Sequence, residues 1–435
     1  MIMCDKGLPS LPDDITFEIF SHLDMDALKS CSLASKALSC LAKPFIHRTL
    51  YLTPRPGAPT GSRIHGLWNE FMGLPVLSER GLLHHTRHLS ISLLRNPLFA
   101  HDLQPHIQYL RTITNLRSLS ARWLDTPSFI SKTDEYFGAF LGTLQSLELE
   151  SPRGDHKQIL YFVCQLPNLR DLKIRGLQDH SHSMRNGGPH FDIKTSPPLD
   201  GTLDLQPNMN QGSTWPHLLN GGLAWSDLKG PQLIFSNLAM LPSGLKFRVL
   251  KLSGCSNLQL LVDACASTLE RMEFTGDSEW FSALFLHRGE RPLFSFVHMI
   301  QPSGGSQYPQ LSFERHPAFQ KLEIKLTEGT NVGSAPRWLS KTLSTITSNV
   351  FTELTISIPI ALVLFAFQAG GENHVDGWRL VDNVLDRLSL RKDVALVVRP
   401  QRSWVMVDKF KESIQKHFPL MWENGKVVLE IPALA

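Results

Sequence analysis

The sequence has few cysteines, and they form no framework. The six stand at Cys4, Cys31, Cys40, Cys164, Cys255 and Cys265, without a CxxC pair. Neither a zinc ribbon nor a thiol–disulfide redox motif is therefore expected. The first ten residues, MIMCDKGLPS, also lack a basic segment followed by an apolar core, so no signal peptide is expected. Both absences favour a reducing compartment, the cytoplasm or the nucleus.

Neither sign of charge dominates the chain. Its 43 Lys and Arg nearly balance 40 Asp and Glu, which leaves a formal net charge of +3, and no run of four or more basic residues occurs. Proteins that bind nucleic acids usually concentrate positive charge in a patch or a tail. The sequence therefore predicts no nucleic-acid partner.

Long hydrophobic runs are missing as well. The longest candidate, ISIPIALVLFAF at 356–367, is shorter than the about 20 residues that a spanning helix needs, and Pro359 would interrupt such a helix. We interpret this run as a buried strand that passes into a buried helix or loop. No membrane partner is expected.

Catalytic motifs are also absent from the sequence. It contains no GxSxG, HExxH, GxGxxG or GxxxxGK[ST]. The densest histidine cluster, His84, His85 and His88, lacks acidic or cysteine partners at a ligand-like spacing, so surface histidines are favoured over a metal site. Cys164 has no nucleophile signature and is expected in the core. We predict no enzymatic activity, no cofactor and no metal.

What the sequence does contain is a helical stretch at 11–52. Pro12 suits the first position of a helix, and Ile15, Ile19 and Leu23 then recur four residues apart as an apolar stripe. Asp24 and Ser35 are predicted N-caps of a second and a third helix, and Pro44 is predicted to end the third. About 40 residues bury too little surface to be stable alone, so the apolar surplus predicts a partner.

This stretch resembles an F-box. The family pattern is a Leu-Pro opening, an acidic first turn, an Ile-Phe pair, a Leu before a loop and a Leu-rich second helix, and the sequence departs from it at Ala37, where many F-boxes carry Trp. The resemblance implies docking on the Skp-family adaptor of an SCF-type cullin–RING ubiquitin ligase. The alternative is a helical cap on the larger domain. The adaptor-binding residues implied are Leu11, Pro12, Ile15, Ile19, Phe20, Leu23, Leu28 and Leu33.

A second pattern, apolar-x-x-apolar-x-apolar, recurs along the rest of the chain. A weaker first copy has Leu89 and Ile91. The last two apolar residues of each copy predict a short strand with one buried face, which stacked neighbours must cover. The seven full copies begin at Leu116, Leu144, Leu169, Phe247, Leu269, Phe319 and Phe351.

These copies resemble degenerate leucine-rich repeats. With the F-box, they resemble fungal F-box substrate receptors, and they imply an irregular leucine-rich-repeat-like α/β solenoid behind a small all-α three-helix F-box. A generic α/β domain is the alternative. The expected domains are the F-box at 8–52, a linker at 53–85, and the repeat domain at 86–435 with an irregular insertion at 178–232, where the sequence is crowded with Gly, Pro, Ser and Asn.

The resulting hypothesis is a substrate-recognition subunit of the ligase, whose contribution is proximity rather than bond chemistry. In such repeats the strand residues between buried positions face the concave surface and would bind an unknown protein target. The alternatives are an F-box scaffold that acts outside ubiquitination and an enzyme whose site lies in the 178–232 insertion. The target-binding candidates are Asp171, Lys173, Arg175, Lys251, Arg271, Glu273, Lys321, Glu323 and Lys325.

Overall fold

The computed structural model divides the chain into an N-terminal unit, Met1–Phe191, and a C-terminal unit, Asp192–Ala435. The residues that it describes are 12–52, 73–92, 108–122, 138–154, 156–176, 178–179, 198–206, 238–241, 244–253, 258–275, 311–326, 335–358, 372–391, 394–400 and 407–430.

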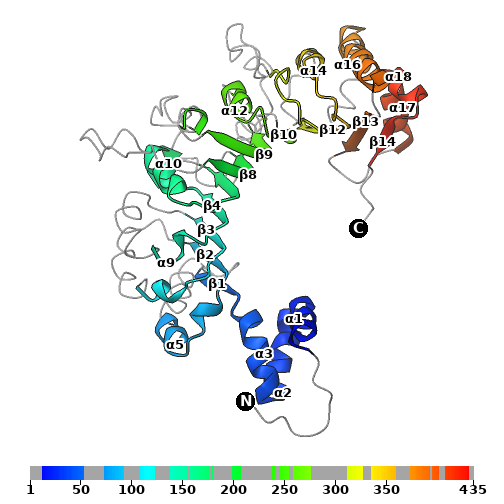
Figure 1. Cartoon of the computed structure of the whole chain (residues 1–435). Coiled ribbons are helices and arrows are strands. Elements are labelled where there is room, and N and C mark those ends of the chain that lie inside the picture. The colour runs from blue at the N-terminus through cyan, green and yellow to red at the C-terminus, as the bar shows by residue number, and fades with distance from the viewer. Residues whose placement is uncertain are drawn as a thin grey trace, which may run out of the picture. The chain divides into compact units, whose positions relative to one another are not determined.

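The N-terminal unit begins with three helices (Figure 1): α1 (Asp13–His22), α2 (Met25–Ala34) and α3 (Lys36–Ile46). The two predicted caps are confirmed, because Asp24 accepts a hydrogen bond from the Ala27 backbone N–H at 2.7 Å and Ser35 accepts one from Leu38 N–H at 3.1 Å. The predicted end of the third helix at Pro44 is wrong. A proline removes one N–H donor, but His47 N–H still bonds the Lys43 carbonyl at 3.0 Å, so the last turn closes around it.

Five neighbouring parallel strands follow in the N-terminal unit. They are β1 (Thr49–Leu52), β2 (His88–Ser92), β3 (Ser118–Arg122), β4 (Ser146–Glu150) and β6 (Asp171–Arg175). The intervening helices are α5 (Leu74–Glu79), η1 (Leu83–His85), η2 (Gln108–Thr112), α9 (Gly138–Leu141) and α10 (His156–Cys164). A separate two-stranded pair joins β5 (Arg153–Gly154) to β7 (Gln178–Asp179).

The C-terminal unit repeats this arrangement with seven neighbouring parallel strands. They are β8 (Leu199–Gln206), β9 (Leu245–Ser253), β10 (Arg271–Thr275), β11 (Lys321–Lys325), β12 (Glu353–Ile358), β13 (Ala395–Pro400) and β14 (Val427–Leu429). Its helices are α12 (Leu258–Ala264), α14 (Ala335–Ser344), α16 (Glu372–Arg391), α17 (Val407–His417) and α18 (Pro419–Glu423). Helices α12, α14 and α16 lie on one side of these strands (Figure 1).

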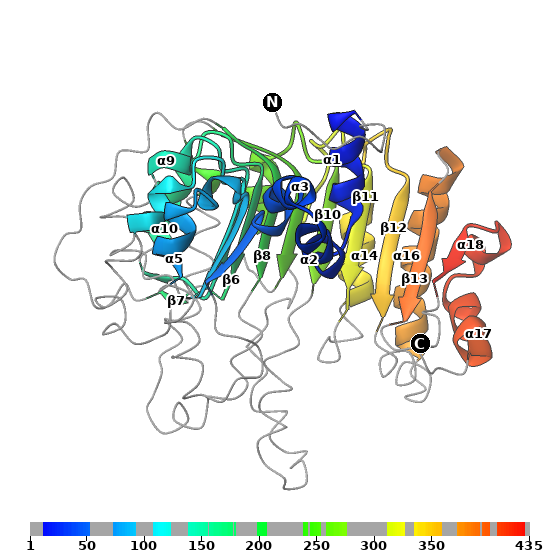
Figure 2. The same ribbon diagram turned by 90° about the horizontal axis from the view of Figure 1, so that it is seen from below.

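The apolar pattern lies in register from strand to strand. In the C-terminal unit Leu250 pairs with Met272, Met272 with Leu322, and Leu322 with Leu354, and Figure 2 shows β10 to β13 running side by side in one direction. All residues of the seven full copies are buried, as are Leu89 and Ile91 of the weaker one. The prediction of a mixed α/β chain is confirmed. The polar residues Glu323 of β11 and Thr355 of β12 are buried as well, so these two strands are covered on both faces rather than on one.

Two predicted irregular stretches contain regular structure. The C-terminal part of the expected linker, at 73–85, carries α5 and η1, whose Leu74 and Leu83 are buried. Within the expected insertion, β8 pairs with β9, with a register shift between Gly201 and Thr202. Residues 53–72 of the linker and most of the insertion lie outside the described residues.

Candidate partner-binding surfaces

The three N-terminal helices build a small core of their own. Its buried residues are Phe20, Leu28 and Ala42, with one residue from each helix. Phe45 of α3 packs on Phe20 with ring centroids 6.0 Å apart. Because so few side chains are fully buried, this core holds the helices together without covering their remaining apolar residues.

The apolar residues that this core does not cover lie mainly on α1 and α2. The exposed fractions are 48% for Ile15, 50% for Phe17, 45% for Ile19, 43% for Met25 and 87% for Leu33. Isolated exposed apolar residues are common on proteins, but a group of large ones on a domain this small is typical of a binding surface. We call these five residues the apolar surface.

The predicted adaptor-binding residues separate into two groups. Ile15, Ile19 and Leu33 belong to the apolar surface, and Pro12 is exposed beside it. Phe20 and Leu28 lie in the core, and Leu23 is half-buried against it, so their side chains position the helices rather than face a partner. Leu11 lies outside the described residues.

Sequence reasoning missed Phe17 and Met25 of the apolar surface. Phe17 lies off the four-residue stripe and reaches Phe45, with ring centroids 5.4 Å apart, while Met25 is the first residue of α2. An apolar count over all residues of the helix, rather than one stripe, would have found them.

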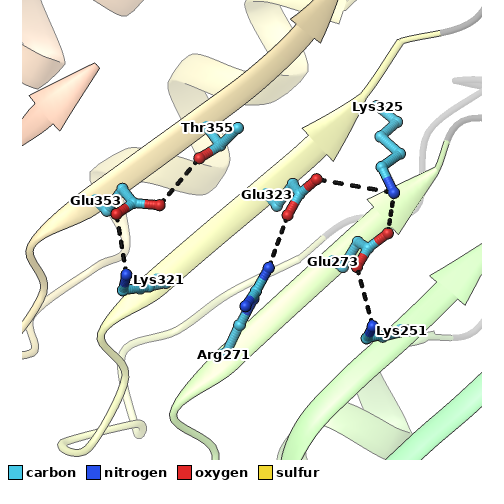
Figure 3. Close-up of polar contacts among 8 residues, drawn as sticks. All are labelled: Lys251, Arg271, Glu273, Lys321, Glu323, Lys325, Glu353 and Thr355. Atoms are coloured by element: carbon cyan, nitrogen blue, oxygen red, sulfur yellow. Dashed lines mark hydrogen bonds and ion pairs between the residues drawn. The ribbon is translucent and has the colours of Figure 1, made fainter. Parts of the chain in front are cut away.

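The second candidate surface is the polar face of β9 to β12, which carries a network of ion pairs (Figure 3). Lys251 lies 3.7 Å from Glu273, which also contacts Lys325. Arg271 lies 2.9 Å from Glu323, and Lys321 lies 3.0 Å from Glu353. We call these four cations and three carboxylates the charged face. The six predicted target-binding residues from these strands are all in it, but Glu323 is buried, with 7% of its surface exposed, so it orients Arg271 and Lys325 rather than facing a target.

The network shifts the protonation of its carboxylates. Burial by itself would raise the pKa of Glu273, but the hydrogen bond from Lys325 and the charges of Lys325, Lys251 and Arg271 bring that pKa below its ordinary value. Glu353 behaves alike: burial opposes ionisation, yet Lys321 and the Thr355 hydroxyl hold its pKa low. Both groups are therefore charged at neutral pH, and the face presents alternating signs.

A smaller network covers the exposed face of β3, β4 and β6. Glu148 lies 2.8 Å from Lys173 and 3.9 Å from Arg175, and Ser120 donates to it at 3.3 Å. Burial would raise the pKa of Glu148, but these contacts lower it. The structure thus brings the predicted Lys173 and Arg175 together, and it places Asp171 at the exposed start of the same strand.

Sequence reasoning missed the carboxylate partners of these cations on β4 and β12. Glu148 lies between the buried Leu147 and Leu149, which is the rule that identified Lys173, so the same rule applied to every copy would have found it. Glu353 lies between the buried Phe351 and Leu354 but starts its strand. Arg122, which pairs with Glu150, closes its strand and follows the last buried position.

The remaining chemical candidates have structural surroundings. Cys164 and Cys265 are buried, and burial raises the pKa of the Cys265 thiol to about 12, which disfavours a reactive thiolate. Among the described residues no three His, Cys, Asp or Glu side chains gather as metal ligands would. None of the described helices is both long enough and apolar enough to cross a membrane.

Comparison with known proteins supports the first surface. A family profile described as F-box-like matches residues 8–53, about a tenth of the 435-residue chain. The match spans α1, α2, α3 and β1, and therefore all of the apolar surface. No curated protein matches the chain. Domains of this family typically bind Skp1-type adaptors. The chain therefore carries an F-box-like domain by this match, and the exposed apolar residues lie within the matched segment.

Proposed function

We propose that this protein is the substrate-recognition subunit of an SCF-type cullin–RING ubiquitin ligase. The F-box-like domain would bind the Skp-family adaptor, and the parallel strands would present a protein target. The observation that carries the proposal is the apolar surface on a domain with so small a core. Burying large apolar side chains against an adaptor supplies the free energy that the domain alone does not gain.

The proposal gives the protein no bond chemistry of its own, and it places the protein in the cytoplasm or the nucleus, where such ligases act. Holding a target near a ubiquitin-loaded enzyme makes the transfer effectively intramolecular. The in-register strands and their buried pattern residues support the interpretation of both units as leucine-rich-repeat-like, in which successive strands form one binding face.

The apolar surface is tested by pull-down of the full chain with purified Skp-family adaptor. A variant with Ile15→Ala, Ile19→Ala and Leu33→Ala keeps the core residues, so it should fold but bind at least a hundredfold more weakly, since interface anchors contribute on the order of 1–2 kcal/mol each. The matched control is Leu260→Ala, which shortens a residue that is 53% exposed on α12 of the C-terminal unit. Equal binding by the parent and the triple variant would contradict the proposed surface.

The charged face is the proposed target site in the C-terminal unit, together with Asp171, Lys173 and Arg175 in the N-terminal unit. Because its charges alternate and neutralise one another, a target would need to offer both signs and replace some of these pairs. Such a requirement favours a folded protein partner over a simple polyanion.

A charge exchange tests this site without breaking it. The double variant Lys321→Glu with Glu353→Lys keeps an ion pair between β11 and β12 but reverses its direction on the surface. We expect unchanged adaptor binding and loss of those co-purifying proteins whose turnover depends on the cullin. If these proteins still bind and turn over, the charged face is not the target site. If the adaptor binds but no partner shows cullin-dependent turnover, the scaffold hypothesis replaces the ligase one.

A further inference from the structure

A row of arginines lies at one edge of the N-terminal unit, apart from both surfaces above. Arg48, Arg87, Arg117 and Arg170 each stand directly before a strand, namely β1, β2, β3 and β6. Their backbones join in a ladder: Arg87 N–H donates to the Arg48 carbonyl and Arg117 N–H to the Arg87 carbonyl, each at 2.8 Å. Gln145, before β4, continues the ladder to Arg170. We call these four arginines the arginine column.

Regular strand spacing fixes how close these residues are. Neighbouring parallel strands lie about 4.8 Å apart, so Arg48 and Arg117 are about 10 Å apart and the whole column spans about 20 Å. Figure 1 shows β1, β2, β3 and β4 in consecutive order, so the starts of these strands form one edge.

The column differs from the strand faces because its charge is not balanced. All four arginines are exposed, and within the described part of the chain none of them makes an ion pair. A few residues further along the same strands, Arg122 pairs with Glu150 and Lys173 with Glu148. Among its described residues, the unit therefore pairs these cations of its strand face with carboxylates and leaves the arginines of its edge without an ion pair.

Histidines adjoin this positive region, and its charges favour their neutral form. His88 follows Arg87, and its pKa is lowered by burial and by the charges of Arg48, Arg87 and Arg117. The pKa of His85 is lowered by burial and by His84, His47 and Lys43, and that of His47 by burial and Lys43. The charged groups that act on these three histidines are all cations.

We propose that the arginine column and these histidines form a docking surface for an acidic peptide segment, one that presents clustered aspartate or glutamate carboxylates. A guanidinium binds a carboxylate through two parallel N–H donors, which suits a row of arginines better than a row of lysines. In an extended peptide the side chains on one side are about 6.6 Å apart. The arginine column stands on strands that are about 4.8 Å apart, so its side chains can meet two or three successive carboxylates of such a peptide.

A nucleic acid is the rival polyanion, and the surroundings of the column disfavour it. The exposed Asp171 directly follows Arg170, and Glu148 and Glu150 lie on the neighbouring β4. A backbone that carries one charge per nucleotide would have to pass these carboxylates, whereas a short peptide need not. The low formal net charge of +3 agrees with a local site rather than a basic domain.

Fluorescence anisotropy with the full-length chain and a labelled hexaglutamate peptide tests the proposal at low salt. We expect saturable binding that weakens as salt rises, and a Kd about tenfold higher for Arg87→Ala with Arg117→Ala. The matched control is Arg248→Ala. Arg248 lies within β9, one residue before Val249, which pairs with the first residue of β10, and it lies 3.9 Å from Glu270. That variant should bind as the parent does.

Binding should also tighten as the pH falls from 8 to 6, because a bound carboxylate favours the charged form of His47, His85 and His88. Circular dichroism verifies that each variant is folded, and the single variant Arg117→Gln replaces the double one if the latter unfolds. The proposal is overturned if hexaglutamate does not bind, if the arginine variants bind it equally well, or if a single-stranded oligonucleotide binds more tightly through the same arginines. No adaptor is present, so the result is independent of the proposed function.

Discussion

The F-box-like helices and the parallel strands use their apolar residues differently. In the strands every residue of the repeated pattern is buried, including the anchors such as Phe319 and Phe351. Among the residues of the three helices whose burial is described, only Phe20, Leu28 and Ala42 are buried, and large apolar side chains such as Ile19 stay exposed. A regular apolar pattern is therefore buried when neighbouring segments repeat it, and stays partly exposed when they do not.

The largest stability effect should come from the aromatic anchors of the strands. Phe319 is fully buried and stacks on Phe313 with centroids 4.2 Å apart and on Phe351 at 5.8 Å. Phe319→Ala should lower the unfolding free energy of the C-terminal unit by about 4 kcal/mol, since it removes a large side chain and leaves a cavity. Hydrogen exchange of peptides from 311–358 measures this. A loss below about 1 kcal/mol would show that the strands do not depend on a shared core.

A smaller and more local effect is expected in the helices. Leu28→Ala should destabilise the three-helix domain by about 2.5 kcal/mol because Leu28 is one of its three buried residues. Exchange should rise across 12–52 and stay unchanged in the C-terminal unit. Ile19→Ala, the exposed counterpart, should change stability by less than about 0.5 kcal/mol. Equal effects of the two substitutions would remove the distinction between core and surface in this domain.

Acid should act on the strands through the charged face. The pKa of Glu273 lies below its ordinary value of 4.5, so its ion pairs stabilise the fold above that pH, and this stability is lost as the pH falls through the lower, folded-state value. Glu273→Gln should therefore reduce the difference in unfolding free energy between pH 7 and pH 3 by about 1 kcal/mol. The control Glu314→Gln changes an exposed glutamate on a turn. If both variants have the same pH profile, the network does not stabilise the strands.

The smallest effect concerns the helix caps. Ser35→Ala removes the hydrogen bond to Leu38 N–H and should cost the helical domain about 1 kcal/mol. Ser35→Thr keeps an acceptor oxygen and should restore most of that loss. Hydrogen exchange across 12–52 measures both changes in unfolding free energy. If Ser35→Ala causes no change, packing alone sets the start of α3.

Much of this architecture could be predicted from the sequence because each strand copy carries its own signal. The seven full copies of the pattern all became strands or strand entries. Strand β8 was missed because its anchor position holds Asp200 rather than an apolar residue, and the register shift at Gly201 interrupts the alternation. The local rule fails where one copy departs from it.

The surfaces were less predictable because they depend on distance between copies. Which carboxylate meets Lys321 or Lys173 is set by the register of neighbouring strands, and no local pattern encodes that. Whether an apolar residue such as Phe20 or Ile19 is buried depends on how three helices pack, although the two are adjacent in sequence. The arginine column was invisible for the same reason, since its successive members are 39, 30 and 53 residues apart in the chain.

The backbone ladder that joins the strand starts has a consequence for how this chain tolerates change. At several strand starts one carbonyl before a strand accepts N–H groups from the last residue before the next strand and from its first residue, as Arg48 does for Arg87 and His88 and Glu270 does for Gln320 and Lys321. Alignment is thus fixed at the entry of each strand and not by the length of the connection before it. Met272 and Leu322 are register partners 50 residues apart, whereas Leu250 and Met272 are 22 apart. A connection can therefore be lengthened between two such strands without changing which residues pair across them.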